Sequence, residues 1–219
     1  MLHLRVVRGL AVLTVMVGWS LAATSGTASA TACGGAVASG SNCTLTGTVT
    51  LTAGTLTLTS PSSLTWASTL TGLDQSVVDT VSGDQQYTVT DATGSGAGWH
   101  VTTSATTFTN GSHALPNSLT FVTTGSVTSI TATSAPTASC SGTCSLPSNS
   151  TTYPVAITTA ASSPVPVTIY DTAAASGLGQ IVIGGSTQPN PVGWWANIPA
   201  NASAGSYTSV ITMAVISGP

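Results

Sequence analysis

Threonine alternates with leucine or valine in two neighbouring stretches of the chain, TLTGTVTLT at 44–52 and TLTLT at 55–59. Successive side chains of an extended strand point to opposite faces, so this pattern places apolar side chains on one face and hydroxyls on the other. The Ala53-Gly54 pair between the two stretches fits a tight turn. The pattern therefore predicts two strands joined by a turn.

Comparable runs of alternating or β-branched residues continue along the chain, each bounded by Gly, Pro, Asn, Asp or Ser. They lie at 63–68, 86–91, 99–109, 118–124, 126–133, 153–159, 165–171, 179–184, 194–198 and 206–216. β-Branched side chains favour strands over helices. We expect an all-β fold, an antiparallel β-sandwich of Ig-like or Greek-key type with about a dozen short strands. A β-solenoid is the alternative, although the chain has no fixed repeat length.

Residues 1–30 have the pattern of a signal peptide rather than of a folded element. Arg5 and Arg8 precede the apolar run GLAVLTVMVGWSLAA, which leads into TASA, a cleavage site of the A-x-A type. The run is too short to span a membrane comfortably. We predict cleavage after Ala30, export of the chain and a single domain over 31–219. An uncleaved N-terminal anchor is the alternative.

The remaining sequence is almost without charge. Arg5 and Arg8 are the only Lys or Arg residues of the 219-residue chain, and the five acidic residues are all Asp, at 74, 79, 84, 91 and 171. Binding to a phosphate backbone needs Lys or Arg, so nucleic acid is a poor partner. Attraction to anionic lipid or to polyanionic wall polymers is excluded for the same reason. We also expect no membrane association after cleavage of the signal peptide.

Four cysteines are present, Cys33, Cys43, Cys140 and Cys144, and an even count in an exported chain predicts disulfides. Of the three possible connectivities we favour the two local pairs, Cys33–Cys43 and Cys140–Cys144. The second pair lies in a stretch rich in Ser, Pro and Gly, 134–154. We expect this stretch to be a long loop between two sheet-forming halves of the domain.

An internal similarity links TVTDATGSGAGWHV, which ends at Val101, with TIYDTAAASGLGQIV at 168–182. In both, an apolar strand ends in Asp, a loop of small residues follows, and glycine precedes the next strand. Asp at a strand end can bond to backbone amides two residues on, and Gly supplies positive φ for the return. We therefore interpret Asp91, Gly98, Asp171 and Gly179 as structural turn residues of two equivalent corners.

Catalytic, metal and cofactor sites have little support in the sequence. Gly94, Gly96 and Gly98 lack the spacing of a nucleotide-binding loop and precede a strand rather than a helix. Asp91 and Asp171 could form a carboxylate pair or bind Ca²⁺, but the aspartates are scattered. His100 and His113 alone make a poor zinc site. We expect no enzyme activity, no cofactor and no metal.

The tryptophans are the stronger functional candidates. Because side chains alternate in a strand, the adjacent Trp194 and Trp195 must point to opposite faces. An exposed Trp in a nearly uncharged surface suits stacking on sugar rings. Trp99, Trp194 and Trp195 are therefore the candidate ligand-binding residues, with packing in the core as the alternative for each.

Two stretches of the chain resemble the WxL-domain family of secreted bacterial surface proteins. In 87–101 a strand, an Asp and a glycine loop lead to Trp99-His100-Val101, which stands for the Trp-x-Leu of the family with Val in place of Leu. In 198–219 the order Pro-Ala, small spacer, Ala-Gly-Ser-Tyr-Thr and alternating strand is similar to the end of the family, with Met213-Ala214-Val215 where a second Trp-x-Leu is often found.

The resemblance implies a non-catalytic β-rich module at the surface of Gram-positive bacteria, bound non-covalently to the cell wall, with peptidoglycan as the expected partner. Other surface proteins are the alternative partners. The first alternative function is a structural subunit that self-associates into a surface layer or fibre, because strand edges rich in Thr and Val carry no Lys to prevent edge pairing. A less favoured alternative is binding to ice or to another inert surface through the Thr rows of 44–59.

Overall fold

The computed structural model describes residues 31–123 and 129–219, so the predicted signal peptide lies outside the described residues. The chain groups into two compact units, Met1–Thr50 and Leu51–Pro219. In the described part of the first unit, β1 (Thr31–Ala32) pairs in parallel with β2 (Cys43–Thr44). The disulfide Cys33–Cys43 closes this small loop with a Cα–Cα distance of 5.1 Å.

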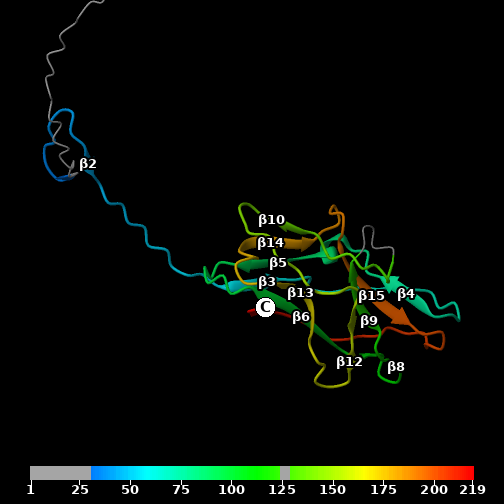
Figure 1. The fold of residues 1–219 in the computed structure, drawn as a ribbon. Helices are drawn as coiled ribbons and strands as arrows, with labels where there is room; N and C mark the ends of the chain where they lie inside the picture. Colours follow the sequence, from blue (N-terminus) through cyan, green and yellow to red (C-terminus); the bar gives the residue numbers. More distant parts are fainter. Residues whose placement is uncertain (1–30, 124–128) are drawn as a thin grey trace, which may run out of the picture. The chain divides into compact units, whose positions relative to one another are not determined.

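The second unit is built from antiparallel sheets packed against each other, which confirms the predicted all-β sandwich (Figure 1). The first sheet has the order β10 (Ala138–Cys140), β14 (Gly179–Gly184), β5 (Gln86–Asp91), β3 (Leu56–Thr59). The second has the order β11 (Val155–Ile157), β9 (Leu119–Thr123), β15 (Val192–Ile198), β4 (Gln75–Val78).

The third sheet is centred on β6 (Trp99–Thr106). One edge of β6 pairs with β13 (Val167–Thr172) and, further along, in parallel with β12 (Thr159–Ala160); β16 (Ile211–Ser217) pairs antiparallel with β6. A short hairpin, β7 (Phe108–Thr109) and β8 (Ala114–Leu115), continues from β6. The 3₁₀ turn η1 (Ser82–Gln85) leads into β5.

Side chains at alternate positions of the strands point inward and fill the core between the sheets. Tyr87 and Val89 of β5 and Ile181 and Ile183 of β14 are buried on one sheet. They belong to one cluster with large side chains of the other two sheets, namely Trp99, Val101, Ile169, Leu119, Phe121 and Trp194. Each of these residues follows the period of two, so burial of one strand face explains the pattern read from the sequence.

The two similar stretches form two adjacent corners at which the chain passes between sheets. One corner connects β5 to β6 and the other connects β13 to β14, and the strands pair crosswise as β5–β14 and β6–β13. The loops touch where the amide of Ala175 donates to the carbonyl of Gly96 at 2.8 Å. The similarity therefore reflects two equivalent corners.

Several local predictions were wrong. The stretch 45–52 pairs with no strand among the described residues, and no turn reverses the chain at Ala53-Gly54, because the amide of Gly54 donates to the carbonyl of Ala92 and extends the pairing with β5. The stretch 63–68 forms no strand. Of the predicted strand 126–133, residues 129–133 form none, and residues 126–128 lie outside the described residues.

The predicted loop at 134–154 contains an edge strand. Its residues Ala138–Cys140 form β10 and pair with β14. The second disulfide, Cys140–Cys144, closes the turn after β10, and Ser145 donates to the carbonyl of Leu178 at 2.9 Å. Both disulfides are thus the local pairs that the spacing favours, and the stretch is fastened to the second corner rather than free.

Candidate functional site

The three candidate tryptophans are buried, so the prediction that they stack on sugars was wrong. Trp99, Trp194 and Trp195 are 0%, 1% and 6% exposed. The physical reason is that β6 and β15 lie in the interior of their sheets, with paired strands on both edges. An aromatic side chain on such a strand is covered by the opposing layer.

Trp99 joins the two corners. Its indole N–H donates to the carbonyl of Gly177 at 2.8 Å, and its ring stacks on Tyr170 with centroids 6.2 Å apart. A Cβ at Gly177 would lie 2.7 Å from the indole nitrogen, so glycine is required for this approach. Trp99 therefore acts as the core anchor of the glycine-rich corner.

Trp194 and Trp195 point to opposite faces of β15, as the alternation predicts, yet both faces are covered. Trp194 packs edge-on against Phe121 at 5.0 Å and donates to the carbonyl of Asp84 at 3.0 Å. The indole nitrogen of Trp195 is buried and has no hydrogen-bond partner among the described residues. Both rings are buried and neither offers an exposed face, although Trp194 contributes to the wall of a hollow of about 540 Å³ described below.

The predicted turn residues have structural contacts of two kinds. Asp91 accepts from the amide and the hydroxyl of Thr93, which closes the first corner as expected. Asp171 does not close its own turn; it accepts from Ser150 and from the hydroxyl of Thr151, so it fastens the preceding loop to β13.

The two predicted turn glycines have positive φ, +78° at Gly98 and +93° at Gly179. A Cβ at Gly98 would lie 2.5 Å from the carbonyl oxygen of Thr172 in the other corner. A Cβ at Gly179 would lie 3.0 Å from the Cβ of Cys144, beside the second disulfide. Both glycines therefore permit close packing as well as the left-handed backbone.

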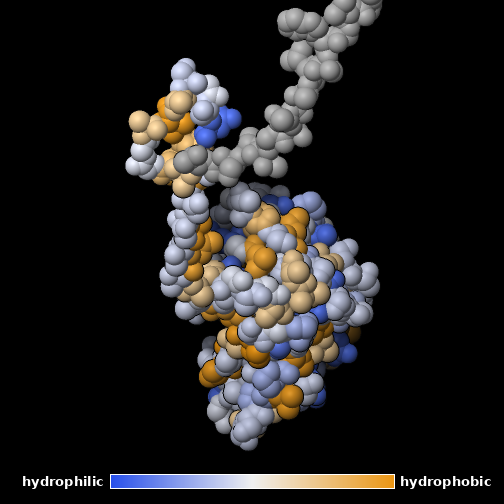
Figure 2. All heavy atoms as spheres, turned by 60° about the vertical axis from the view of Figure 1, so that its left-hand side comes forward, coloured by the Kyte–Doolittle hydropathy of each residue, from blue (hydrophilic) through white to orange (hydrophobic). Residues whose placement is uncertain are grey.

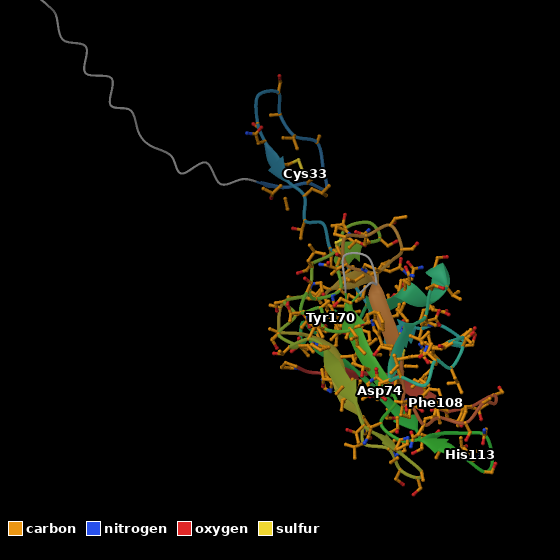
Figure 3. The ribbon with its side chains drawn as sticks, turned by 90° about the vertical axis from the view of Figure 1, so that its right-hand side faces the viewer. Cys33, Asp74, Phe108, His113 and Tyr170 are labelled. Atoms are coloured by element: carbon orange, nitrogen blue, oxygen red, sulfur yellow. A yellow bond between two sulfur atoms is a disulfide. The ribbon has the colours of Figure 1, made fainter. Side chains whose placement is uncertain are left out.

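A different aromatic group is open to solvent. We define the aromatic groove by Trp66, Phe108 and Tyr207, of which Trp66 and Tyr207 are half-buried. Trp66 meets Phe108 edge-on with centroids 5.6 Å apart. The cluster lies between two hollows of about 540 Å³ and about 740 Å³, each lined by all three residues. Figure 3 places Phe108 and His113 toward the same end of this unit, away from Tyr170.

Two irregular segments form the walls of the aromatic groove. The segment 63–68 is held by Asp79, whose carboxylate accepts from the amide of Thr65 at 2.7 Å, and by the indole of Trp66, which donates to the carbonyl of Trp194 at 3.0 Å. The second segment, which contains Tyr207 and Thr208, is held by reciprocal backbone hydrogen bonds between Thr208 and Thr109. Because the N–H of Trp66 is bonded internally, a ligand could contact only the exposed part of its ring.

The lining of the aromatic groove is neutral. It contains no Asp, Glu, His, Lys, Arg or Cys; its polar side chains are hydroxyls and one amide, Ser60, Ser62, Ser63, Thr65, Ser68, Thr69, Ser118, Asn197, Ser203, Ser206, Thr208 and Ser209, with the phenol of Tyr207. Figure 2 likewise shows hydrophobic side chains in small groups among polar ones on the face that it presents. Such a lining can stack on a ligand and donate or accept neutral hydrogen bonds.

Trp66 was not predicted as a site residue because it lies in a stretch predicted to be a strand. The alternation of side chains does not distinguish Trp66 from the other tryptophans. Its exposure depends on the two irregular segments that form the walls of the aromatic groove, and their conformation does not follow from alternation. A usable signal was the high density of Ser around it, since SPSSLTWAS has few residues able to cover an indole.

Ionisable groups near the groove form one carboxylate pair. Asp79 is buried and accepts a second hydrogen bond from the amide of Val81 at 2.8 Å. Desolvation by partial burial raises the pKa of Asp84, and the neighbouring carboxylate of Asp79 raises it further. In the part of the chain that the structure describes, no three metal-ligating side chains cluster. No helix among the described residues has the length and apolar character needed to cross a membrane.

Comparisons with protein-family models, with curated proteins and with solved structures found no match for the chain. The resemblance to the WxL-domain family therefore stays a prediction from the residues. The structure adds one geometric fact, namely that the two stretches that resemble WxL domains, 87–101 and 198–219, lie side by side. Val215 pairs with Val101 and Ser217 pairs with Trp99 where β16 runs along β6.

Proposed function

We propose that the chain is a secreted, non-catalytic surface protein that binds a cell-wall glycan, peptidoglycan in the first instance, through the aromatic groove. The observation that carries the proposal is the half-buried Trp66, which lines two adjoining hollows with neutral polar walls. Indole and phenol rings stack on the apolar faces of sugars, while hydroxyl and amide side chains bond to sugar hydroxyls.

The composition of the groove favours binding over catalysis. General acid–base chemistry needs a carboxyl, imidazole or similar group at the reacting atoms, and the lining offers only the phenol of Tyr207. With no Lys or Arg in 31–219, attraction to the wall rests on stacking and neutral hydrogen bonds. Binding of this kind is weakly dependent on salt.

Export to the cell surface is supported by two further features. The two disulfides fit an extracellular protein. The resemblance of 87–101 and 198–219 to WxL domains implies wall association, and these two stretches are neighbours on β5, β6 and β16. We include localisation at the cell wall in the proposal on these grounds.

Blocking the groove tests the proposal without removing a structural contact. Ser206 is exposed and lines both hollows, so Ser206→Trp places a large side chain at their junction. Ser186 is also exposed and lines neither hollow, which makes Ser186→Trp the matched control. The exported full chain and both variants are sedimented with purified peptidoglycan.

We expect the wild type and Ser186→Trp to pellet with peptidoglycan and Ser206→Trp to bind at least about tenfold more weakly, a loss of about 1.4 kcal/mol. Raising the salt concentration is expected to change binding little. Equal binding by all three proteins would place the ligand elsewhere. Absence of binding by the wild type would refute wall binding itself.

A further inference from the structure

The stretch 44–52 has the pattern of a half-buried strand, but its apolar side chains lie in water. Leu45, Val49 and Leu51 are 85%, 81% and 86% exposed. Together with Gly47 they occupy one face of the alternating stretch, and threonines occupy the other. Beyond β2 this stretch pairs with no strand among the described residues. An apolar stripe of this spacing gains free energy when a sheet edge covers it.

The sandwich has an unpaired strand edge of suitable length at β16. The amide of Gly218 donates to the carbonyl of Gly98, and Val210 accepts from the amide of Thr106, so the even-numbered residues of β16 bond to β6. The backbone groups of the odd-numbered residues therefore point away from β6. In the described residues no strand pairs with that side of β16.

This edge lacks the features that protect natural edge strands. The sequence of β16, ITMAVIS, contains no Lys, no other charge and no Pro. Ile211, Met213 and Val215 are partly buried and pack against the core, and β16 contacts β3, whose Leu56 and Leu58 also face inward. An added strand would extend this apolar layer and cover it.

The stretch 44–52 matches this edge in period and in charge. In paired strands, directly opposed residues have side chains on the same face. Opposing Val49 to an odd-numbered residue of β16 therefore places Leu45, Val49 and Leu51 on the inner layer and the threonines on the solvent side. Neither partner carries an ionisable group, so no repulsion opposes their pairing.

The stretch 44–52 is connected directly to β3, and this connection favours binding to a second copy over binding to β16 of the same molecule. Gly54 and Thr55 are hydrogen-bonded to Ala92, so the chain is committed to the edge of β5 directly after 44–52. A reversal before Gly54 would lay the stretch on the outer edge of β3, which is only 4 residues long, rather than on β16, which is 7 residues long. The longer edge is therefore better filled by the stretch of another molecule.

We propose that residues 44–52 of one copy add as a strand to the outer edge of β16 in a second copy. Strand addition of this kind uses main-chain hydrogen bonds for affinity and alternate side chains for specificity. Each copy donates one strand and accepts one at a different surface, so the contact is head-to-tail and generates open chains. The added strand would border the aromatic groove, because Ile211 and Met213 of β16 also line its smaller hollow. The inference does not rest on the proposed glycan binding and is tested without glycan.

The first test changes the donated strand at positions that are exposed in the single copy. Leu45→Lys, Val49→Lys and Leu51→Lys are combined in the exported full chain. The matched control combines Leu73→Lys, Val81→Lys and Val165→Lys, which are also exposed and add the same charge. We expect the wild type and the control to form concentration-dependent oligomers in analytical ultracentrifugation, and the donor variant to be monomeric.

The second test identifies the accepting edge by amide hydrogen exchange at high and low protein concentration. Assembly is expected to slow exchange at Ile211, Met213 and Val215 at least about tenfold and to leave Thr212 and Ala214, already bonded to β6, unchanged. A monomeric wild type, an oligomer that the donor substitutions leave intact, or protection at β3 in place of β16 would each overturn the proposal.

Discussion

Two tyrosine hydroxyls in the same core have opposite hydrogen-bonding states. The hydroxyl of Tyr153 donates to the carbonyl of Ile169 at 2.7 Å and accepts from the side-chain amide (Nδ2) of Asn149 at 3.1 Å. The hydroxyl of Tyr87 is buried and has no partner among the described residues. Burial raises the pKa of both phenols, so both stay neutral in the folded protein. An unpaired buried hydroxyl destabilises, whereas a paired one stabilises modestly.

We therefore predict opposite effects of the same substitution. Tyr87→Phe is expected to stabilise the fold by about 1 kcal/mol, because it removes an unsatisfied group, and Tyr153→Phe to destabilise it by about 1 kcal/mol or more. Urea unfolding of the two variants measures the difference. Destabilisation by Tyr87→Phe would mean that its hydroxyl has a partner in solution, such as a buried water.

The glycines of the first corner also differ from one another. Gly94 and Gly98 both have positive φ, but a Cβ at Gly94 meets nothing within 4 Å, while a Cβ at Gly98 would collide with the backbone of Thr172 and Ala173. Gly94→Ala carries backbone strain alone, and Gly98→Ala carries strain and overpacking. The contact between the two corners therefore depends on Gly98.

We predict that Gly94→Ala costs about 1 kcal/mol of stability and Gly98→Ala about 2–4 kcal/mol. The comparison of the two unfolding free energies isolates the close approach, because the change in side chain and the sign of φ are shared. Equal costs at the two positions would show that the corners do not pack as closely as described.

At the scale of elements, the strands that lie on a buried face were predictable and the peripheral ones were not. The runs around Val89, Val101 and Ile181 alternate because one face packs in the core. The stretch 44–52 has the same alternation without a partner, so periodicity alone could not separate a paired strand from an unpaired one. β4 and β10 lack clear alternation, and pairing with longer strands brings them into the sheets.

The 3₁₀ turn η1, which leads into β5, makes the stability of the fold depend on pH through Asp84. The folded-state pKa of Asp84 is raised by desolvation and by Asp79, so the folded state holds the proton more tightly than the unfolded chain. The stabilisation that protonated Asp84 provides is fully present below the pKa that Asp84 has in the unfolded chain. It is lost as the pH rises through the higher pKa that Asp84 has in the folded state. At neutral pH the charged Asp84 is therefore unfavourable.

We predict that Asp84→Asn, which imitates the protonated side chain, is more stable than the wild type at neutral pH. Its advantage is expected to shrink as the pH falls through the raised pKa, because the wild type then gains its own proton. Chemical unfolding of both proteins across the acidic range measures this. An advantage that stays constant with pH would contradict the assignment.

At the scale of the whole molecule, the candidate site depends on which aromatic residues the sandwich leaves uncovered. Sequence reasoning correctly assigned the fold class, the local disulfides and the neutral surface, since these follow from alternation, spacing and composition. It could not rank Trp66 above Trp99, Trp194 and Trp195. Burial of an indole is decided by the layer opposite to it, and that layer comes from distant parts of the chain.

The central claim is that a neutral glycan occupies the aromatic groove, and the indole N–H signals of the tryptophans test it most directly. Soluble peptidoglycan fragments are titrated into the isotope-labelled full chain and followed by two-dimensional NMR. Trp66 lines both hollows and Trp99 lines neither, so the account predicts a saturable shift of the Trp66 signal with the Trp99 signal unchanged. A Trp66 signal that does not respond, or a response confined to Trp99, would contradict it.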